Sequence, residues 1–299
     1  DEYRIFNDDM QGTGAIVMAA VISGLKVTGE SFSDQRLVVF GAGTAGTGMA
    51  DQIHAAMVRD GLNEADARAR IWLVDRDGLV TDDMDALPDY QQAYARPASE
   101  VASWKRHGRR IELLDVVERV EPTILIGTST LHNAFTEEVV TALARGVERP
   151  ILLPLSNPTS RIEVSPEDAI RWSDGRALLA TGIPVPPIEY EGTAFHIGQG
   201  NNALLYPGLG LGTIVAGASR ITDGMLLAAA RAVAGQVDAT PLGSSLLPAV
   251  EDLRASSATV AVAVIEAAQA DGVAAADVGD PVQAVLDAMW QPVYPDDLG

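Results

Sequence analysis

The chain has 299 residues, enough for one large or two modest domains, and its 47% hydrophobic and 21% charged residues are ordinary for a globular protein. It contains no cysteine, which excludes disulfides, a thiolate nucleophile and cysteine-ligated metals and is compatible with a cytoplasmic location. A net charge of −20 makes nucleic acid and anionic membrane surfaces unsuitable partners.

Two adjacent carboxylates, Asp8 and Asp9, precede a glycine-containing turn and a helix expected over residues 14–24. This helix is apolar nearly all round, which predicts burial, and its apolar run is too short to span a membrane. Paired carboxylates suit a hard divalent cation that prefers oxygen ligands. Either aspartate could instead simply cap the helix, and from the pair alone the cap is the better interpretation.

The strongest motif is an apolar run, Leu37–Phe40, that ends in glycines at G-x-G-x-x-G spacing and leads into a helical pattern. Strand, glycine-rich turn and helix in this order form the dinucleotide-binding fingerprint. Gly41 would permit the tight turn, Gly43 the approach of a pyrophosphate, and Gly46 close packing of helix on strand. The helix N-terminus would then offer free N–H groups to the phosphates. The alternative is an ordinary glycine-rich turn.

A second strand, residues 71–74, follows a short polar helix at 63–69 and ends in Asp75. An acidic residue here can hold the adenine ribose hydroxyls, although it could also merely start a turn. Arg76 could meet the 2′-phosphate of NADP, but Asp77 would repel that phosphate and Asp75 would compete. NAD is therefore favoured over NADP.

Residues 79–110 are polar and irregular and predict a surface excursion, with a solvated basic patch at 105–110. Beyond it, buried strands are expected near 123–127, 150–155 and 177–181, and Thr136 is a candidate N-cap for the helix that starts at 137.

Polar side chains follow several of these strands. Thr128 and Ser129 follow the first, Ser156 and Asn157 the second, and a Gly-Gln-Gly-Asn-Asn cluster ending in Asn201 and Asn202 comes later. Loops at the carboxyl edge of a parallel sheet lie over the cofactor, although Asn157 and the paired asparagines could equally be turn residues.

The C-terminal part is alanine-rich and predicts four helices without evident chemistry, at 209–218, 223–234, 258–270 and 281–289. We expect them to cover the sheet or to form a subunit contact. The predicted fold is α/β, a Rossmann-type doubly wound, mostly parallel sheet with helices on both faces. Residues 1–30 form a lead-in segment and buried helix, and residues 31–299 the dinucleotide-binding domain with its helical cover.

Four segments together resemble the malic enzymes in order and spacing: Phe6–Thr13, Gly41–Gly46, Leu155–Thr159 and Gly198–Asn202. The closing Met289–Tyr294 also looks like the end of that family. The resemblance covers nearly the whole chain, but only the C-terminal, NAD-binding part of the family's architecture. The family oxidises L-malate to oxaloacetate with NAD(P), then decarboxylates it to pyruvate and CO₂ with Mg²⁺ or Mn²⁺.

The resemblance implies roles for matching residues. Asp9 resembles the metal-ligating aspartate, with Asp8 beside it, and Asp75 the ribose contact. Asn157, Asn201 and Asn202 match asparagines that hold the nicotinamide and malate or pyruvate. The expected cofactor-binding set, which also includes Asn157 and Asn201, is completed by Thr13, Gly41, Ala42, Gly43, Thr44, Ala45, Gly46, Arg76, Thr128, Ser129 and Ser156.

The family's general base lysine, general acid tyrosine, malate-binding arginine and Glu-Asp metal ligands lie upstream of the segments found here. Because none is present and the chain opens without an initiator methionine, we expect a fragment that is inert alone and needs the missing N-terminal half. A homo-oligomer is also expected.

Three alternatives remain open. A malolactic enzyme shares these motifs but converts malate to lactate and CO₂. An amino-acid-dehydrogenase-like domain shares the glycine-rich loop, although the Asn-Asp-Asp and Gly-Asn-Asn segments argue against it. The third is a non-catalytic nucleotide-binding module.

Overall fold

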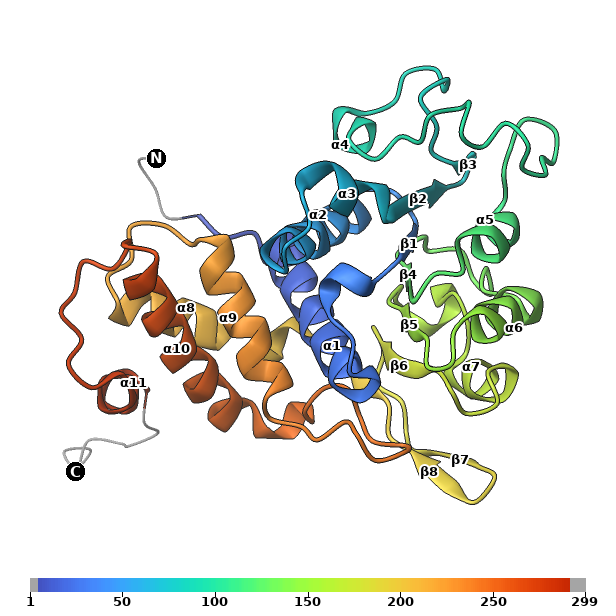
Figure 1. The fold of residues 1–299 in the computed structure, drawn as a ribbon. Helices are drawn as coiled ribbons and strands as arrows, with labels where there is room; N and C mark the ends of the chain where they lie inside the picture. Colours follow the sequence, from blue (N-terminus) through green and yellow to red (C-terminus); the bar gives the residue numbers. More distant parts are fainter. Residues whose placement is uncertain (1–4, 291–299) are drawn as a thin grey trace.

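The computed structural model describes residues 5–290 apart from the side chains of Asp9 and Asp252, and it contains a seven-stranded sheet between two layers of helices (Figure 1). The strand order is β3-β2-β1-β4-β5-β6-β9, and every pairing is parallel except the antiparallel β2–β3 edge. The strands are β1 Leu37–Phe40, β2 Ile71–Asp75, β3 Gly78–Leu79, β4 Ile124–Gly127, β5 Ile151–Pro154, β6 Leu178–Thr181 and β9 Gly198–Gln199, with a separate hairpin of β7 Ile188–Tyr190 and β8 Thr193–Phe195.

The α-helices lie between and after these strands. They are α1 Thr13–Thr28, α2 Thr44–Arg59, α3 Glu64–Ala69, α4 Asp89–Gln92, α5 Leu113–Val120, α6 Glu137–Gly146, α7 Pro166–Trp172, α8 Tyr206–Val215, α9 Asp223–Ala234, α10 Leu253–Ala270 and α11 Pro281–Ala288. Short 3₁₀ turns occur at Phe32–Asp34, Thr159–Arg161, Asn202–Leu204 and Val250–Asp252, and a π-helical turn, Asp8–Gly12, leads into α1.

Alternating side chains along the strands pack into two separate hydrophobic cores, one on each face of the sheet. In β1, Leu37 and Val39 join the core formed with α1 and α2, whereas Val38 and Phe40 join the core under α5, α6 and α7. This follows from the period-2 geometry of a strand, whose successive side chains point to opposite faces. The predicted fold class, a mostly parallel sheet with helices on both faces, is confirmed.

The order in which strands are added to the sheet reverses at β1. The chain moves outward from β1 to β2 and then returns to β4 on the other side of β1. The carboxyl ends of β1 and β4 therefore form the topological switch point, where ligands of open α/β sheets bind.

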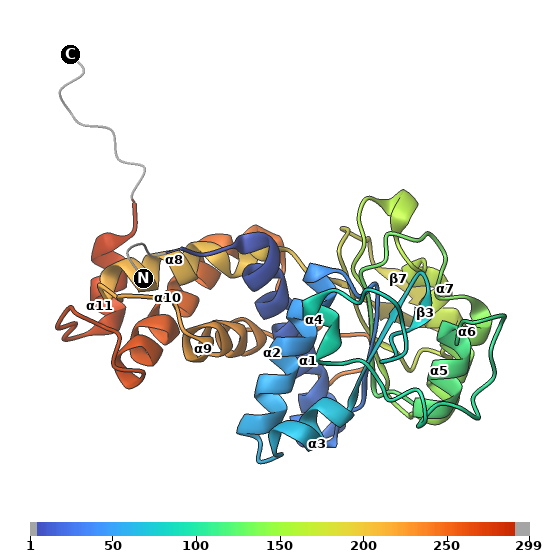
Figure 2. The same cartoon turned by 90° about the horizontal axis from the view of Figure 1, so that it is seen from above.

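The C-terminal helices do not cover the sheet directly, and this corrects the first of the two roles expected from the sequence. Their main contacts are with one another and, through α9, with α1, so that they extend away from the sheet beyond its outer helical layer (Figures 1 and 2). Their buried apolar residues are covered by helix–helix packing, which periodicity alone cannot distinguish from packing on a sheet.

Helix α1 and its lead-in residues, Met10–Thr28, are the one helical stretch in the described chain that is long and apolar enough to cross a membrane by length and composition. The stretch is 67% buried within the protein, between the sheet and α9. Packing inside this fold accounts for its apolar character.

The residue that caps the opening helical turn is Asn7, whose side chain accepts a hydrogen bond from the Met10 backbone N–H. The expectation that Asp8 or Asp9 is the cap was therefore wrong. An amide oxygen serves this purpose as well as a carboxylate, and Asp8 makes other contacts, described below. Thr136 caps α6 as predicted. The predicted closing segment beyond residue 290 lies outside the described residues.

Candidate functional site

The glycine-rich loop has the geometry that the fingerprint predicts. Gly41 has φ +107°, and a Cβ there would lie 2.5 Å from the Thr128 carbonyl carbon. A Cβ on Gly46 would lie 2.2 Å from the Gly41 carbonyl oxygen, whereas a Cβ on Gly43 would meet nothing within 4 Å. Gly41 and Gly46 are thus required by the protein itself, while the space over Gly43, the residue that caps the N-terminus of α2, is free for a ligand.

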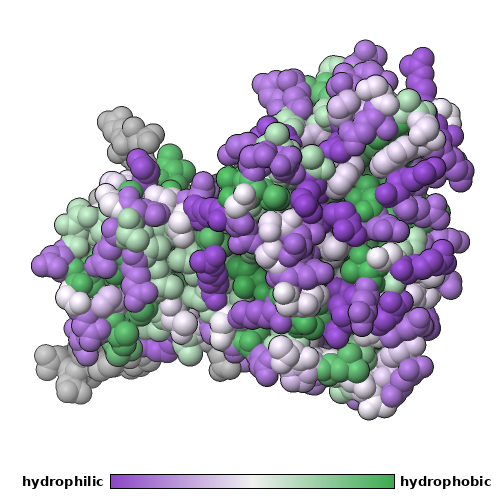
Figure 3. Space-filling model, viewed as in Figure 1, coloured by the Kyte–Doolittle hydropathy of each residue, from purple (hydrophilic) through white to green (hydrophobic). Residues whose placement is uncertain are grey.

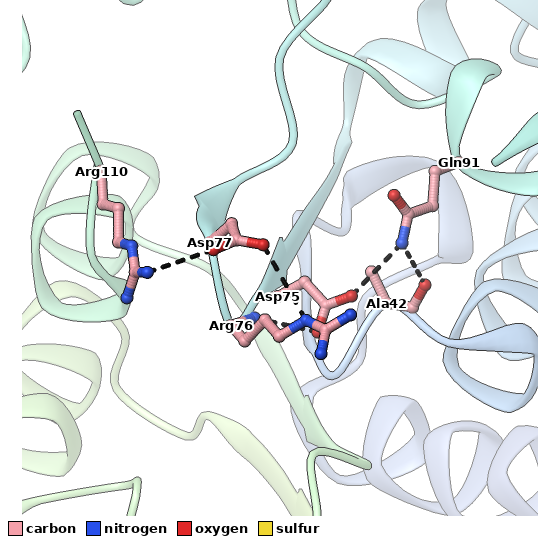
Figure 4. A network of polar contacts seen from close by, with 6 residues as sticks. All are labelled: Ala42, Asp75, Arg76, Asp77, Gln91 and Arg110. Carbon is pink, nitrogen blue, oxygen red and sulfur yellow. Dashed lines mark hydrogen bonds and ion pairs between the residues drawn. The ribbon is translucent and has the colours of Figure 1, made fainter. Parts of the chain in front are cut away.

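Asp75 ends β2 beside this loop and is held by a side chain that the sequence did not point to. The Gln91 amide nitrogen donates to the Ala42 carbonyl at 2.7 Å and to Asp75 Oδ2 at 3.3 Å (Figure 4). Asp75 Oδ1 accepts from the Arg76 backbone N–H. The Asp75 carboxylate is therefore fixed against the glycine-rich loop.

The charged residues next to Asp75, namely Arg76, Asp77 and Arg110, are more exposed than Asp75 itself. Arg110 donates to Asp77 Oδ1 at 3.2 Å, and the Arg76 guanidinium lies 3.8 Å from the other Asp77 oxygen (Figure 4). The Arg76 side chain is 91% exposed, and among the described residues its guanidinium forms an ion pair with Asp77 and not with Asp75. Pairing of Asp77 with arginines weakens the repulsion that was expected between Asp77 and a 2′-phosphate, so Asp75 is left as the main acidic group here.

Residues 79–110 are not simply a surface excursion. Within this segment Gln91 and Tyr94 are buried, and the Tyr94 hydroxyl donates to Asp51 of α2 at 2.6 Å. Burial and the hydrogen bond to Asp51 raise the pKa of Tyr94 well above its ordinary value. The segment packs back onto α2 and places Gln91, whereas its basic part near His107 is exposed as predicted.

The loops after β4 and β5 are joined by one buried carboxylate, Glu163. The Ser129 backbone N–H and hydroxyl donate to Glu163 Oε1, and so does the Ser156 hydroxyl, at 2.8, 2.9 and 2.5 Å. Thr128 donates instead to the Gly41 carbonyl at 2.8 Å. The hydroxyls of Thr128, Ser129 and Ser156, which were expected to contact a cofactor, thus hold the loops together.

A cavity of about 360 Å³ gathers the other predicted residues. It is lined by side chains from four distant segments, among them Thr13, Asn157, Asn201 and Asn202, together with Gln199. Apart from apolar groups, the lining consists of neutral hydroxyl and amide groups. Such a cavity offers hydrogen bonds in both directions and no charge of its own.

Asn202 connects this cavity to the carboxylate of Asp8. Its amide nitrogen lies 3.1 Å from Asp8 Oδ2, from the Asp8 carbonyl and from the Thr13 hydroxyl. The other Asp8 oxygen, Oδ1, is buried without a hydrogen-bond partner. A carboxylate with one satisfied and one unsatisfied oxygen fits a bound cation.

The described residues do not by themselves complete a metal site. Within them, no three His, Asp or Glu side chains gather closely enough to hold an ion. The side chain of Asp9, the expected ligand, lies outside the described set.

All the predicted cofactor and substrate segments except Thr13 follow the carboxyl ends of strands and thus share one edge of the sheet, and Thr13 lies on the same cavity. Residues 10–269 match the family described as "Malic enzyme, NAD binding domain". The chain belongs to this family. A Rossmann-type sheet and the glycine-rich loop at its switch point are what an NAD-binding domain of a malic enzyme requires.

Curated relatives and solved structures agree. The chain is 55% identical over 296 residues to "NAD-dependent malic enzyme 3" of Bacillus subtilis, covering 98% of this chain and 52% of the relative. It is 45% identical over 300 residues to "NAD-dependent malic enzyme" of Acinetobacter baylyi, with 98% and 52% covered. The malic enzyme structure from Pyrococcus horikoshii superposes with a TM-score of 0.74 at 25% identity, over 96% of this chain and 60% of that one. The chain thus spans about half the length of the curated relatives it matches.

Proposed function

We propose that this chain binds NAD across the carboxyl edge of its sheet and is the cofactor-binding part of an enzyme that oxidises and decarboxylates L-malate. The observation that carries the proposal is the free space over Gly43 at the N-terminus of α2, between glycines that the fold itself requires. In this proposal the pyrophosphate lies on residues 41–46 and the adenine ribose on Asp75.

The nicotinamide and the substrate belong, in this proposal, to the loops after β4, β5 and β9. Asn157, Asn201 and Asn202 would hold the nicotinamide amide and malate or pyruvate through their own amides, with Thr13 beside them. Because the cavity is neutral, positive charge for a dicarboxylate would come from a cation and from the rest of the longer polypeptide.

Mg²⁺ or Mn²⁺ is the proposed metal, with Asp9 as ligand and Asp8 beside it. The unpartnered Asp8 Oδ1 supports this assignment. When bound, such a cation supplies Lewis-acid chemistry to a hydroxy acid. The chain's own contribution is to fix Asp8 through Asn202 at the edge of the substrate cavity.

Calorimetric titration of NAD and of NADP into the chain tests the proposal. We expect saturable NAD binding that is tighter than NADP binding, because the Asp75 carboxylate accepts ribose hydroxyls and repels a 2′-phosphate. Asp75→Asn should reduce this preference about tenfold, since it removes one charge–phosphate contact. Failure of both nucleotides to bind would contradict the proposal, and equal affinities would contradict the role of Asp75.

We also propose that the isolated chain is catalytically inert, that a longer cytoplasmic protein carries the activity, and that the N-terminal half of the relatives supplies the acid and base. Malate with NAD and Mn²⁺ should then give no NADH with this chain alone. In the longer protein, pyruvate with NADH would indicate a malic enzyme, and lactate without NADH a malolactic enzyme.

A further inference from the structure

Glu163 is a fully buried carboxylate at the carboxyl edge of the sheet. Its relative exposure is 0%, and it lies between the 3₁₀ turn at 159–161 and α7. It has no Lys, Arg or His partner within 4 Å among the described residues. A buried acidic side chain without a cation must be stabilised by hydrogen-bond donors.

Four donors surround it, and all come from Ser129 and Ser156. Both serines give their hydroxyl and their backbone N–H, at distances between 2.5 and 3.3 Å. The Ser156 hydroxyl in turn accepts the Thr130 N–H at 2.9 Å. Glu163 is thus the centre of a network that joins the loop after β4 to the loop after β5.

This network borders the glycine-rich turn on one side and reaches the substrate cavity on the other. The Ser129 backbone nitrogen would lie 2.6 Å from a Cβ on Gly41, so this loop lies directly against the glycine-rich turn. Ser156 is followed by Asn157, which lines the substrate cavity. Gly127, at the end of β4, leaves the space that the Glu163 carboxyl group fills, because a Cβ there would lie 2.6 Å from Glu163 Cδ.

We infer that Glu163 is a positioning residue that holds the loops after β4 and β5 in the conformation that the nicotinamide half of NAD requires. It acts through Ser129 and Ser156 and does not itself reach the cofactor. The inference rests on the proposed function. The network explains why a carboxylate is needed at position 163. An alanine there would leave the four donors without an acceptor. A glutamine would place an amide N–H against the Ser156 N–H, and two donors cannot form a hydrogen bond.

The test compares NAD binding with ADP binding in wild type, Glu163→Gln and Glu163→Ala. ADP carries the adenosine and pyrophosphate without the nicotinamide, so it reports the half of the site on the β1–β2 side. We expect NAD affinity to fall about tenfold in Glu163→Gln and about a hundredfold in Glu163→Ala, while ADP affinity changes by less than about threefold.

A matched control separates positioning from folding. Asp115 is also a buried carboxylate, but it lies in α5, beside His107 and Lys105. Asp115→Asn should leave both affinities unchanged. In addition, Ser156→Ala should add little to the effect of Glu163→Gln, because both changes break the same network.

The outcomes are distinct. Equal losses of NAD and ADP affinity in the Glu163 variants, or an equal NAD loss in Asp115→Asn, would overturn the inference by showing a purely structural role. Unchanged NAD affinity in Glu163→Ala, with thermal unfolding showing a folded protein, would also overturn it. If wild type binds neither nucleotide, the proposed function fails first and the inference falls with it.

Discussion

Gln91 fixes the acidic residue at the end of β2. It is 6% exposed, and one amide nitrogen serves both the Ala42 carbonyl and the Asp75 carboxylate. Because a buried acceptor left without its donor costs about 1–3 kcal/mol, this single amide couples the glycine-rich loop to the ribose side of the site.

Gln91→Leu keeps the volume but removes the donor. We expect NAD affinity to fall about tenfold, because Asp75 is no longer held in one orientation. Gln92→Leu is the control, since Gln92 is an exposed neighbour on the same helix. Equal effects of the two changes in calorimetry would show that Gln91 has no specific role.

Tyr94 anchors the segment that carries Gln91. Its raised pKa means that the folded state holds the hydroxyl proton more tightly than the unfolded chain does. This stabilisation is fully present below the ordinary tyrosine pKa of about 10 and is lost as pH rises above it.

Tyr94→Phe should therefore lower the free energy of unfolding by about 1 kcal/mol at neutral pH, with the difference from wild type shrinking above about pH 10. Urea unfolding at pH 7, 9 and 11 measures this. Tyr90→Phe, at a 41% exposed tyrosine of α4, provides the comparison. A difference for Tyr94→Phe that stays constant across all three pH values would contradict the account.

The residues predicted from sequence and those missed differ in a physical way. The three glycines, Asp75 and the asparagines lie in short motifs whose local spacing carries the signal. Gln91 and Glu163 gain their roles from partners far along the chain, up to 49 positions away. The available signal was weak: a glutamate between Ile162 and Val164, in an otherwise apolar triplet.

Among the elements, α8 and α10 make close contact through two glycines. A Cβ on Gly208 would lie 2.5 Å from the Ser257 carbonyl, and one on Gly212 would lie 2.6 Å from the Ala261 carbonyl. These glycines are four residues apart and so share one face of α8. Gly210, on another face, has open space around a Cβ.

Gly212→Val should therefore destabilise the protein by about 1–3 kcal/mol, because the added side chain forces the helices apart. Gly210→Ala should instead stabilise it by about 0.5–1 kcal/mol through helix propensity. Denaturant unfolding of both variants checks this. A destabilisation by Gly210→Ala as large as that by Gly212→Val would show that the α8–α10 contact is not what matters.

Strands and helices were largely predictable because each depends on local periodicity. Helix α9 was placed at its observed bounds, and β2 within one residue. The packing of α8 to α11 was not predictable, because an alanine-rich helix packs equally well on a sheet or on other helices. Only the three-dimensional arrangement shows which occurs.

At the scale of the whole molecule, the sheet half and the helical half have different surfaces. Polar side chains gather over the sheet half, on the right of Figure 3, whereas the helical half shows a paler, mixed surface. Exposed apolar side chains occur on these helices, including Tyr206 and Ile214 of α8 and Val282 and Leu286 of α11. Such exposure supports the expectation of a homo-oligomer.

Light scattering at several concentrations tests that expectation. We expect a mass above that of the 31.4 kDa monomer, which Ile214→Glu at a 75% exposed position should shift toward monomer. A monomeric wild type would contradict it.

The most direct measurement for the central claim is NAD titration into Gly43→Val beside Gly48→Ala. Neither position has any atom within 4 Å of a new Cβ, and Gly43 has φ −72°, which valine adopts readily. Both variants should therefore fold, with unfolding temperatures close to wild type. If the pyrophosphate lies over Gly43, Gly43→Val should abolish measurable NAD binding while Gly48→Ala retains it. NAD binding by a folded Gly43→Val with wild-type affinity would contradict the placement of the cofactor and the account built on it.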